Sequence, residues 1–246
     1  MNNNIKQYIK TALFTLGSIG ASKDRSRMVY YHDVHSDNCY TDMSTTLSVF
    51  ATHIEIIRNN GFSIVREFSG KNKEIRVGFD DGFRGIWDNR DFFIENSIFP
   101  TIFIPTSLIG KPGYLSITEI IELENLGFNI QSHGVRHTNM AQMPSEVLLD
   151  DMTSSKQQLE SLLGKTVDEV CFPMGYFNDD VIAAAVKAGY RTLFSSMPAP
   201  TRFPQCVYGR LFLQPLTPGQ VKKSIRGGQR LLQKHYEKLH YQPDHI

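Results

Sequence analysis

The sequence predicts an α/β fold in which a mostly parallel sheet forms a closed or nearly closed barrel. Short apolar runs alternate with longer amphipathic segments along the chain, and regular alternation of strands and helices is typical of parallel sheets. The alternation gives about six or seven strand–helix units, which favours a barrel over an open sheet. Polar residues gather directly after several expected strands, and in such barrels the chemistry lies at the carboxyl ends of the strands.

Each expected element depends on a local pattern. Apolar residues at helical spacing, followed by Gly61, predict a helix over 46–60. Pro144 and Gly164 suit the first turn and the end of a long helix, and Asn178 suits an N-cap. The expected strands cover residues 27–31, 62–65, 75–79, 100–104, 128–132, 169–172, 191–195 and 206–213. The other expected helices cover residues 85–96, 117–126, 144–163 and 178–188, with a last one opening at Thr217-Pro218.

The composition is that of an ordinary soluble globular protein and excludes several classes of partner. The chain has 246 residues, of which 41% are hydrophobic and 21% are charged. The formal net charge is +1, so neither a nucleic-acid partner nor a polybasic membrane anchor is indicated. The three cysteines are too few and too scattered for a disulfide framework. No apolar stretch approaches the roughly 18 residues of a transmembrane segment.

One large domain is expected over residues 27–235. Residues 1–26 are expected to form an N-terminal lead-in, either a helix or a weak signal-like segment, because two lysines precede a short apolar run. Threonine, glycine and serine interrupt that run, which favours a helix and a cytoplasmic location; export, for example to a periplasm, is the alternative. Residues 236–246 contain few apolar anchors and are expected to form a mobile tail.

Two pairs of polar residues carry the strongest functional signal. Asp80 and Asp81 follow one expected strand, and His133 and His137 follow another. One carboxylate and two imidazoles can hold a divalent metal and leave positions open for water and substrate. The second carboxylate can take a proton from that water. Either pair alone would more often be a turn or a polar loop, so the case for metal-assisted hydrolysis depends on their combination.

With these motifs the chain resembles the polysaccharide deacetylases, carbohydrate esterases that remove N-acetyl and sometimes O-acetyl groups from sugars. Three motifs carry the resemblance, in the family's order: an aromatic residue before Asp-Asp-Gly at 79–82, two histidines with three residues between them at 133–137, and Pro-x-Gly at 173–175. The match covers roughly residues 28–210. It implies that residues 27–235 are a catalytic domain folded as a distorted (β/α) barrel with about seven strands.

The resemblance also implies a role for each motif residue. Asp81, His133 and His137 would bind Zn²⁺, although Co²⁺, Ni²⁺ or Fe²⁺ also suit such ligands. Asp80 would be the general base, and the backbone N–H of Met174 would help to stabilise the oxyanion. The residues expected to contact the substrate are Pro173, Gly175 and Tyr176.

The chain departs from the common family pattern at the general acid. Many members carry a late Leu-x-His motif, which is absent here after Gly175. The segment at 30–34 resembles the Tyr-His-Asp-Val segment of biofilm poly-N-acetylglucosamine deacetylases, in which the histidine is the proposed acid. We therefore expect His32 to be the acid, oriented by Asp33; the simpler alternative is that His32 only ends the first strand. The later histidines fall in the expected terminal helix or tail: His235, His240 and His245.

A second departure is Cys171, which stands where many members have an arginine that pairs with the base. Arg210 is the expected substitute, joined to Asp80 by a bidentate pair. Cys171 itself is expected to be a small buried apolar side chain. Gly134 replaces the usual serine or threonine after the first histidine, which we expect to be a minor change.

The sequence therefore predicts a metal-dependent hydrolase that removes N-acetyl groups from an amino sugar in a polysaccharide, an oligosaccharide or a glycan precursor. Hydrolysis of an O-acetyl ester, or of an amide in a smaller molecule, is the alternative on the same fold. A catalytically silent carbohydrate-binding barrel is the alternative from a different class, since the late histidine is missing.

Overall fold

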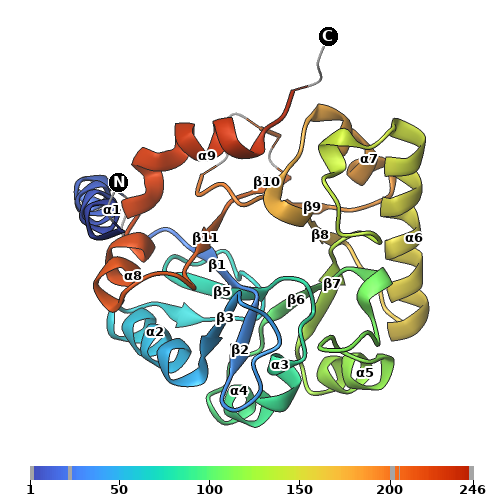
Figure 1. Ribbon diagram of the computed structural model, residues 1–246, viewed down its shortest axis with the longest axis horizontal. Helices are drawn as coiled ribbons and strands as arrows, with labels where there is room; N and C mark the ends of the chain where they lie inside the picture. Colours follow the sequence, from blue (N-terminus) through green and yellow to red (C-terminus); the bar gives the residue numbers. More distant parts are fainter. Residues whose placement is uncertain (1–2, 22–23, 200–202, 205, 244–246) are drawn as a thin grey trace.

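The strands of this chain form one curved parallel sheet with helices around its outside (Figure 1). The computed structural model describes residues 3–21, 24–199, 203–204 and 206–243. The strand order across the sheet is β10-β9-β8-β7-β6-β5-β1-β11. The bounds of these strands, in that order, are Val207–Tyr208, Thr192–Phe194, Glu169–Cys171, Asn129–Ser132, Thr101–Ile104, Glu74–Phe79, Arg27–Tyr31 and Arg210–Phe212.

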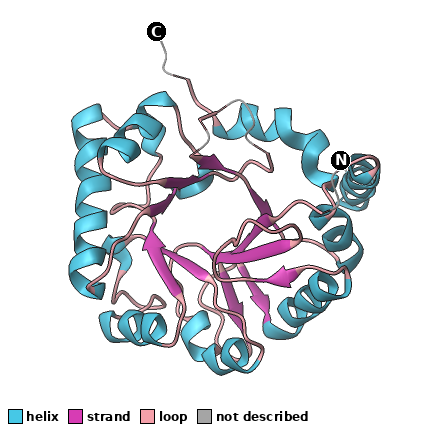
Figure 2. Cartoon of the chain, turned by 180° about the vertical axis from the view of Figure 1, so that it is seen from behind, coloured by secondary structure: helices cyan, strands magenta, loops and turns pink. Residues whose placement is uncertain are grey.

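The two edge strands of the sheet are consecutive pieces of one chain segment, separated only by Gly209. β10 pairs with β9, and β11 pairs with β1. The segment therefore leaves one edge of the sheet and joins the other, which closes the ring of strands seen in Figure 2. The expected distorted barrel of about seven strands is confirmed, with β10 and β11 counted as one broken strand. The expectation of a single continuous strand over 206–213 is wrong.

Neighbouring residues along the strands alternate between the inside of the barrel and the side that faces the helices. The outward residues Val29, Ile102 and Leu193 belong to the large core cluster. A separate small cluster lies on the opposite face of the same strands; its members are Met28, Phe103, Cys171 and Phe194. Side chains thus fill the inside of the barrel, and the strands are buried on both faces, as is usual for parallel sheets.

The helices begin and end at residues that suit those positions. The side chains of Thr46, Ser116 and Asn178 each accept a hydrogen bond from a backbone N–H of the first turn that follows. Gly164 ends α6 in the left-handed region, with φ 65°. The helices around the barrel are α2 (Leu47–Asn59), α3 (Gly85–Asp88), α4 (Arg90–Glu95), α5 (Ile117–Asn125), α6 (Ser145–Leu163), α7 (Asp179–Lys187) and α8 (Pro218–Ile225).

Two local features differ from the sequence-based expectation. The helix expected over 85–96 is two short helices that separate at Asn89, whose side chain donates to the Gly85 carbonyl at 2.8 Å. A small parallel pair, β2 (Asp33–His35) and β3 (Ser44–Thr46), was not expected and packs against α3. The remaining strand, β4 (Ser63–Ile64), pairs with the start of β5.

Both ends of the described chain pack on the barrel. Helix α1 (Asn3–Ser18) lies against α8 and the short helix η4 (Gly228–Leu232), so the expected lead-in contains a helix. Helix α9 (Gln233–His240) crosses the domain boundary expected at residue 235, and Tyr241 pairs with Phe177. The packed part of the chain therefore reaches into the stretch expected to be a mobile tail. Residues 244–246 of that stretch lie outside the described residues.

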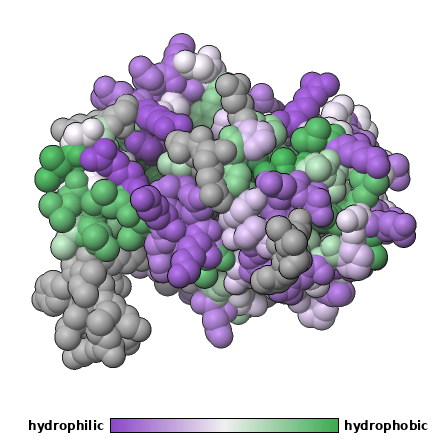
Figure 3. Space-filling view, turned by 90° about the horizontal axis from the view of Figure 1, so that it is seen from above, coloured by the Kyte–Doolittle hydropathy of each residue, from purple (hydrophilic) through white to green (hydrophobic). Residues whose placement is uncertain are grey.

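The surface is mostly polar on the face seen in Figure 3, with an apolar group at the side that carries α1. Leu16, near the end of α1, and Ile19, just after it, are exposed apolar residues. None of the helices in the described ranges is long and apolar enough to cross a membrane.

Candidate active site

The Asp80-Asp81 pair follows β5 at the carboxyl end of the barrel. The Asp80 N–H donates to the Tyr31 carbonyl at 3.0 Å, which extends the pairing of β1 with β5 by one residue. Asp81 then enters the left-handed region, with φ 73°, which aspartate adopts more readily than most residues. The two adjacent carboxylates consequently reach different partners: Asp80 reaches Arg210, and Asp81 reaches two histidines.

Asp81, His133 and His137 bring three potential metal-ligand atoms together. Oδ1 of Asp81 lies 3.4 Å from Nε2 of His133 and 2.8 Å from Nε2 of His137. The other ring nitrogen of His133, Nδ1, lies 2.7 Å from the Cys171 carbonyl. That carbonyl can only accept, so Nδ1 carries a proton; Nε2 can donate to Asp81 while it is protonated and can bind a metal once it has lost that proton. One carboxylate and two imidazoles in this arrangement fit a divalent metal of the zinc type.

The same contacts set the charge of the cluster. Burial alone would raise the pKa of Asp81, but hydrogen bonds and charge from His133 and His137 hold this pKa well below its ordinary value. Burial lowers the pKa of His137, and Asp81 more than reverses that effect, so the pKa of His137 is raised overall. Asp81 is therefore ionised at neutral pH, which is the state that a carboxylate ligand needs.

A buried carboxylate from α6 holds the loop between the two histidines. Asp151 is 0% exposed and accepts hydrogen bonds from the Val135 N–H at 2.8 Å and the Arg136 N–H at 3.3 Å. The Arg136 side chain also donates to it, at 2.9 Å. Gly134 has φ 72°, and a Cβ at this position would lie 2.8 Å from Oδ1 of Asp151. Glycine at 134 therefore makes room for the carboxylate that orders the loop.

Arg210 binds both oxygens of Asp80. Nη1 donates to Oδ1 at 2.6 Å and Nη2 donates to Oδ2 at 2.8 Å, which is the bidentate contact expected from the sequence. The guanidinium lies 4.1 Å from the ring centre of Tyr30 and 5.4 Å from that of Phe103, inside the barrel. Two rings and a two-point pair together fix the plane of this side chain.

The pair keeps Asp80 ionised. Burial alone would raise the pKa of Asp80, but the charge and hydrogen bonds of Arg210 lower it overall, with help from the nearby His133 and His32. At neutral pH Asp80 is a carboxylate, so it can accept a proton.

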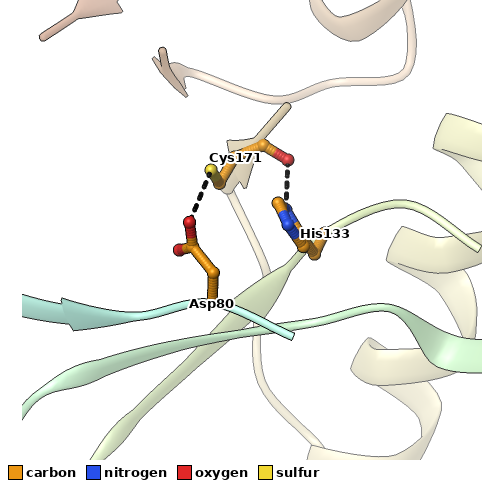
Figure 4. A group of neighbouring side chains, drawn as sticks. All are labelled: Asp80, His133 and Cys171. Carbon is orange, nitrogen blue, oxygen red and sulfur yellow. Dashed lines mark hydrogen bonds between the residues drawn. The ribbon is translucent and has the colours of Figure 1, made fainter. Parts of the chain in front are cut away.

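Cys171 is fully buried beside this pair, as expected (Figure 4). Its Sγ lies 3.9 Å from Oδ2 of Asp80, and its carbonyl accepts from His133. These three residues could also gather ligand atoms around a metal. However, Arg210 occupies both oxygens of Asp80, and burial raises the pKa of the thiol well above its ordinary value. Cys171 therefore helps to orient His133 and Asp80, and the three residues do not form a second metal site.

The two carboxylates and the imidazoles open into one cavity of about 260 Å³. His32 lines it, and its Nδ1 is buried with no hydrogen-bond partner in the part of the chain that the structure describes. Its backbone N–H is held by the side chain of Gln214 at 2.9 Å. The expected site residues that line the cavity are His32, Asp80, Asp81, His133, His137, Met174 and Gly175. The expected site residues outside its described lining are Pro173, Tyr176 and Arg210.

The Pro173–Gly175 turn forms part of the cavity wall. Met174 lies in the left-handed region with φ 57°, and its side chain points outward, 52% exposed. Gly175 has φ 72°, and a Cβ there would lie 2.6 Å from Oγ of Ser196 and 2.8 Å from Nδ1 of His240. The turn is therefore packed too tightly for a residue larger than glycine.

Three residues that the sequence did not single out also line the cavity: Tyr30, Met43 and Ser196. His240, which the sequence analysis assigned to the terminal helix or tail, lines it too. Tyr30 could have been found from the alternation along β1, because it shares the inward face with Met28. Ser196 could have been found because it follows β9 at the functional end of the barrel. Met43 and His240 had no local signal, since a loop and the terminal helix bring them to the site.

Asp33 does not orient His32 in this structure. No hydrogen bond joins the two side chains among the described residues, and Asp33 is fully buried. Burial raises the pKa of Asp33 to about 7, although nearby donors at Ser44, Val34 and Gly85 oppose the shift. Adjacent residues of an extended segment point to opposite sides, which explains why Asp33 reaches the β2–β3 side instead of the cavity.

Comparison with known proteins shows the family to which the chain belongs. A family model for polysaccharide deacetylases matches residues 69–193, half of the chain. The chain belongs to the polysaccharide deacetylase family. This membership confirms the expected reaction class, which is hydrolytic deacetylation of sugars. Metal dependence is typical of the family, in agreement with the ligand set at Asp81, His133 and His137.

Individual relatives agree with the family and the fold. YxkH of Bacillus subtilis (strain 168), named as a polysaccharide deacetylase, is 21% identical over 192 residues, 74% of this chain and 68% of YxkH. The Streptococcus pyogenes deacetylase PplD in complex with acetate has a TM-score of 0.72 at 17% identity, covering 82% of this chain and 98% of that one. A de-N-acetylase from Aggregatibacter actinomycetemcomitans has a TM-score of 0.70 at 17% identity, and the match covers 82% of this chain and 100% of that one. At these identities the solved structures show a shared fold, which confirms the predicted barrel.

Proposed function

We propose that this chain removes N-acetyl groups from an amino sugar in a polysaccharide, an oligosaccharide or a glycan precursor. One observation carries the proposal: Asp80, an ionised carboxylate paired with Arg210, lies beside the ligand set of Asp81 and two histidines in one cavity. Two relatives support the choice of an amide substrate and an acetyl group. One is named as a de-N-acetylase, and the other holds acetate, the product of such a reaction.

Zn²⁺ is the proposed metal, because one carboxylate and two imidazoles are a frequent catalytic zinc ligand set. Co²⁺, Ni²⁺ or Fe²⁺ suit the same donors. When bound, the metal would polarise the acyl carbonyl and acidify a water molecule. The chain's own contribution is to present the ligands: the Cys171 carbonyl fixes the ring of His133, and Asp151 fixes the loop that leads to His137.

Asp80 is the proposed general base, and Arg210 positions it and keeps it ionised. His32 is the proposed general acid for the leaving amine, supported by its unpartnered Nδ1 in the same cavity. The Met174 N–H is the proposed oxyanion donor, supported by the place of its turn in the cavity wall. Gly175 is the proposed substrate contact of this turn. Pro173 and Tyr176, on either side of it, remain proposed substrate contacts from the sequence alone, since only Gly175 of the three lines the cavity.

Acetate release from N-acetylglucosamine oligomers tests the proposal. The protein is stripped with a chelator, then resupplied with Zn²⁺ or Co²⁺, and both acetate and free amine are measured. We expect equal amounts of the two products, only with metal present. Acetate released solely from an O-acetylated sugar would make the protein an esterase. Oligomer binding without acetate from any substrate would make it a silent carbohydrate-binding barrel.

A further inference from the structure

A histidine of the C-terminal helix faces the catalytic cavity and has no part in the chemistry proposed above. His240 ends α9 and lines the same cavity as Asp80 and His137. It is only 9% exposed, and its Nδ1 has no hydrogen-bond partner among the described residues. Buried polar atoms are normally paired. An unpaired one at the wall of a cavity is free to take a bound ligand as its partner.

Backbone pairing fixes His240 at this place. Its carbonyl accepts from the Phe177 N–H at 3.0 Å, and the Gln242 N–H donates to the Phe177 carbonyl at 2.9 Å. Its ring stacks on Tyr236, with 5.9 Å between the ring centres. The imidazole is therefore a built part of the wall, supported from the main chain and from its own helix.

The ring also lies against the turn that carries the proposed oxyanion donor. A Cβ at Gly175 would lie 2.8 Å from Nδ1 of His240 and 2.6 Å from Oγ of Ser196, and a hydrogen-bond contact of the Met174 backbone raises the pKa of the His240 ring, against the larger effect of burial. His240, Ser196 and the turn thus form one continuous wall. A sugar whose acyl oxygen reaches Met174 must place the neighbouring atoms of its ring along this wall.

The charge of His240 suits hydrogen bonding to an uncharged group. Burial lowers the pKa of His240 to about 4, the Met174 backbone opposes this shift, and His235 and Arg210 add to it. A neutral imidazole is a poor acid at neutral pH, but it has one donor and one acceptor nitrogen. His240 is therefore suited to hydrogen bonding and not to protonating the leaving amine.

We propose that His240 recognises the substrate by a hydrogen bond to a hydroxyl oxygen of the amino sugar that carries the scissile acyl group. The inference rests on the proposed function. It gives the C-terminal helix α9 a direct part in the site, and it explains why the turn needs glycine at 175.

Oligosaccharide binding to a catalytically inactive protein tests this role. The parent is Zn²⁺-loaded Asp80→Asn, and the probe is the N-acetylglucosamine tetramer, titrated in a calorimeter. Adding His240→Phe should weaken tetramer binding roughly five- to tenfold, while His240→Asn, which keeps a polar group near Nδ1, should lose less. His235→Phe is the matched control, because the same substitution then falls on an exposed histidine of α9; it should leave binding unchanged. Zn²⁺ affinity should be the same in all four proteins.

Two negative outcomes are distinguishable. If the parent binds Zn²⁺ but not the tetramer, the proposed function is wrong, and this inference with it. If the parent and the His240→Phe variant bind the tetramer equally well, only the role of His240 is wrong. Should His240→Phe fail to fold, His240→Ala gives the same comparison with the same two outcomes.

Discussion

The terminal nitrogens of Arg210 donate to the two oxygens of Asp80 at 2.6 and 2.8 Å, inside the barrel. The last strand of the barrel is interrupted at Gly209, directly before this arginine. This pair accounts for the cysteine at 171, because the positive charge reaches Asp80 from a different strand. Since both carboxylate oxygens are bound, the orientation of Asp80 is fixed relative to Asp81 and the cluster of histidines.

Replacing Arg210 with lysine should lower kcat roughly 10- to 100-fold with little change in KM, because an ammonium cannot make both charged hydrogen bonds. Steady-state acetate release measures the effect. Arg76→Lys is the matched control: Arg76 makes a two-point contact with Glu169 at 2.8 Å for both bonds, at the opposite end of the barrel. That variant should lose stability and keep its kcat. An unchanged kcat in Arg210→Lys would contradict the positioning role.

Replacing Asp151 with alanine should weaken Zn²⁺ binding about tenfold, because residues that orient metal ligands typically affect affinity by this amount. The substitution leaves the N–H groups of Val135 and Arg136 without their acceptor. Competition with a chromophoric chelator measures the affinity. Asp150→Ala is the control, since Asp150 is the exposed neighbour on α6 and lies 3.9 Å from Arg136. Equal affinities in the two variants would show that Asp151 has no special role.

Replacing Gly175 with alanine should lower kcat/KM at least tenfold, because a Cβ would displace Ser196 or His240 from the cavity wall. Gly164→Ala separates this effect from backbone strain. Gly164 has a similar φ of 65° but no atom within 4 Å of its Cβ position. The control should lose only about 1–2 kcal/mol of stability from the left-handed conformation. If both variants lost activity equally, the loss in Gly175→Ala would be due to backbone strain and not to displacement of Ser196 or His240.

Replacing Asp33 with asparagine should stabilise the protein increasingly as the pH rises. The folded-state pKa of Asp33, about 7, exceeds its ordinary value of 3.8. The folded protein therefore binds an extra proton between these values, and the contribution of Asp33 to stability falls as the pH rises through this window. The difference in unfolding free energy between variant and wild type should grow on the order of 4 kcal/mol from pH 4 to pH 8.

Denaturant unfolding at several pH values measures this difference. Asp37→Asn, at an exposed position in the loop that follows β2, should show no such change. If the difference in unfolding free energy between Asp33→Asn and wild type did not change with pH, the carboxyl of Asp33 would not have a raised pKa in the folded protein.

The sequence predicted those parts of the site that depend on strand ends. In a parallel barrel, residues that follow separate strands must meet at one end, so Asp80, His133 and the turn at 173–175 could be placed together from spacing alone. The contact of Arg210 with Asp80 was also predicted, from the cysteine at 171. These inferences needed only periodicity and the resemblance to the family.

Other features depend on packing between distant segments and left no local pattern. The break at Gly209 arises because the first half of the segment pairs with β9 and the second half pairs with β1. His240 reaches the cavity because Tyr241 pairs with Phe177, and Asp151 reaches the histidine loop because α6 packs beside β7. Short, polar stretches near the C-terminus carry no signal of such docking, which is why the expected tail began too early.

The central claim is that Asp80 acts as the base beside a bound metal, and acetate release at equal metal content tests it most directly. Wild type and Asp80→Asn are loaded with Zn²⁺, their bound metal is quantified, and acetate release from N-acetylglucosamine oligomers is compared. We predict similar metal content and a rate about 10²- to 10⁴-fold lower in the variant. A metal-loaded Asp80→Asn that releases acetate within a few-fold of the wild-type rate would contradict the account.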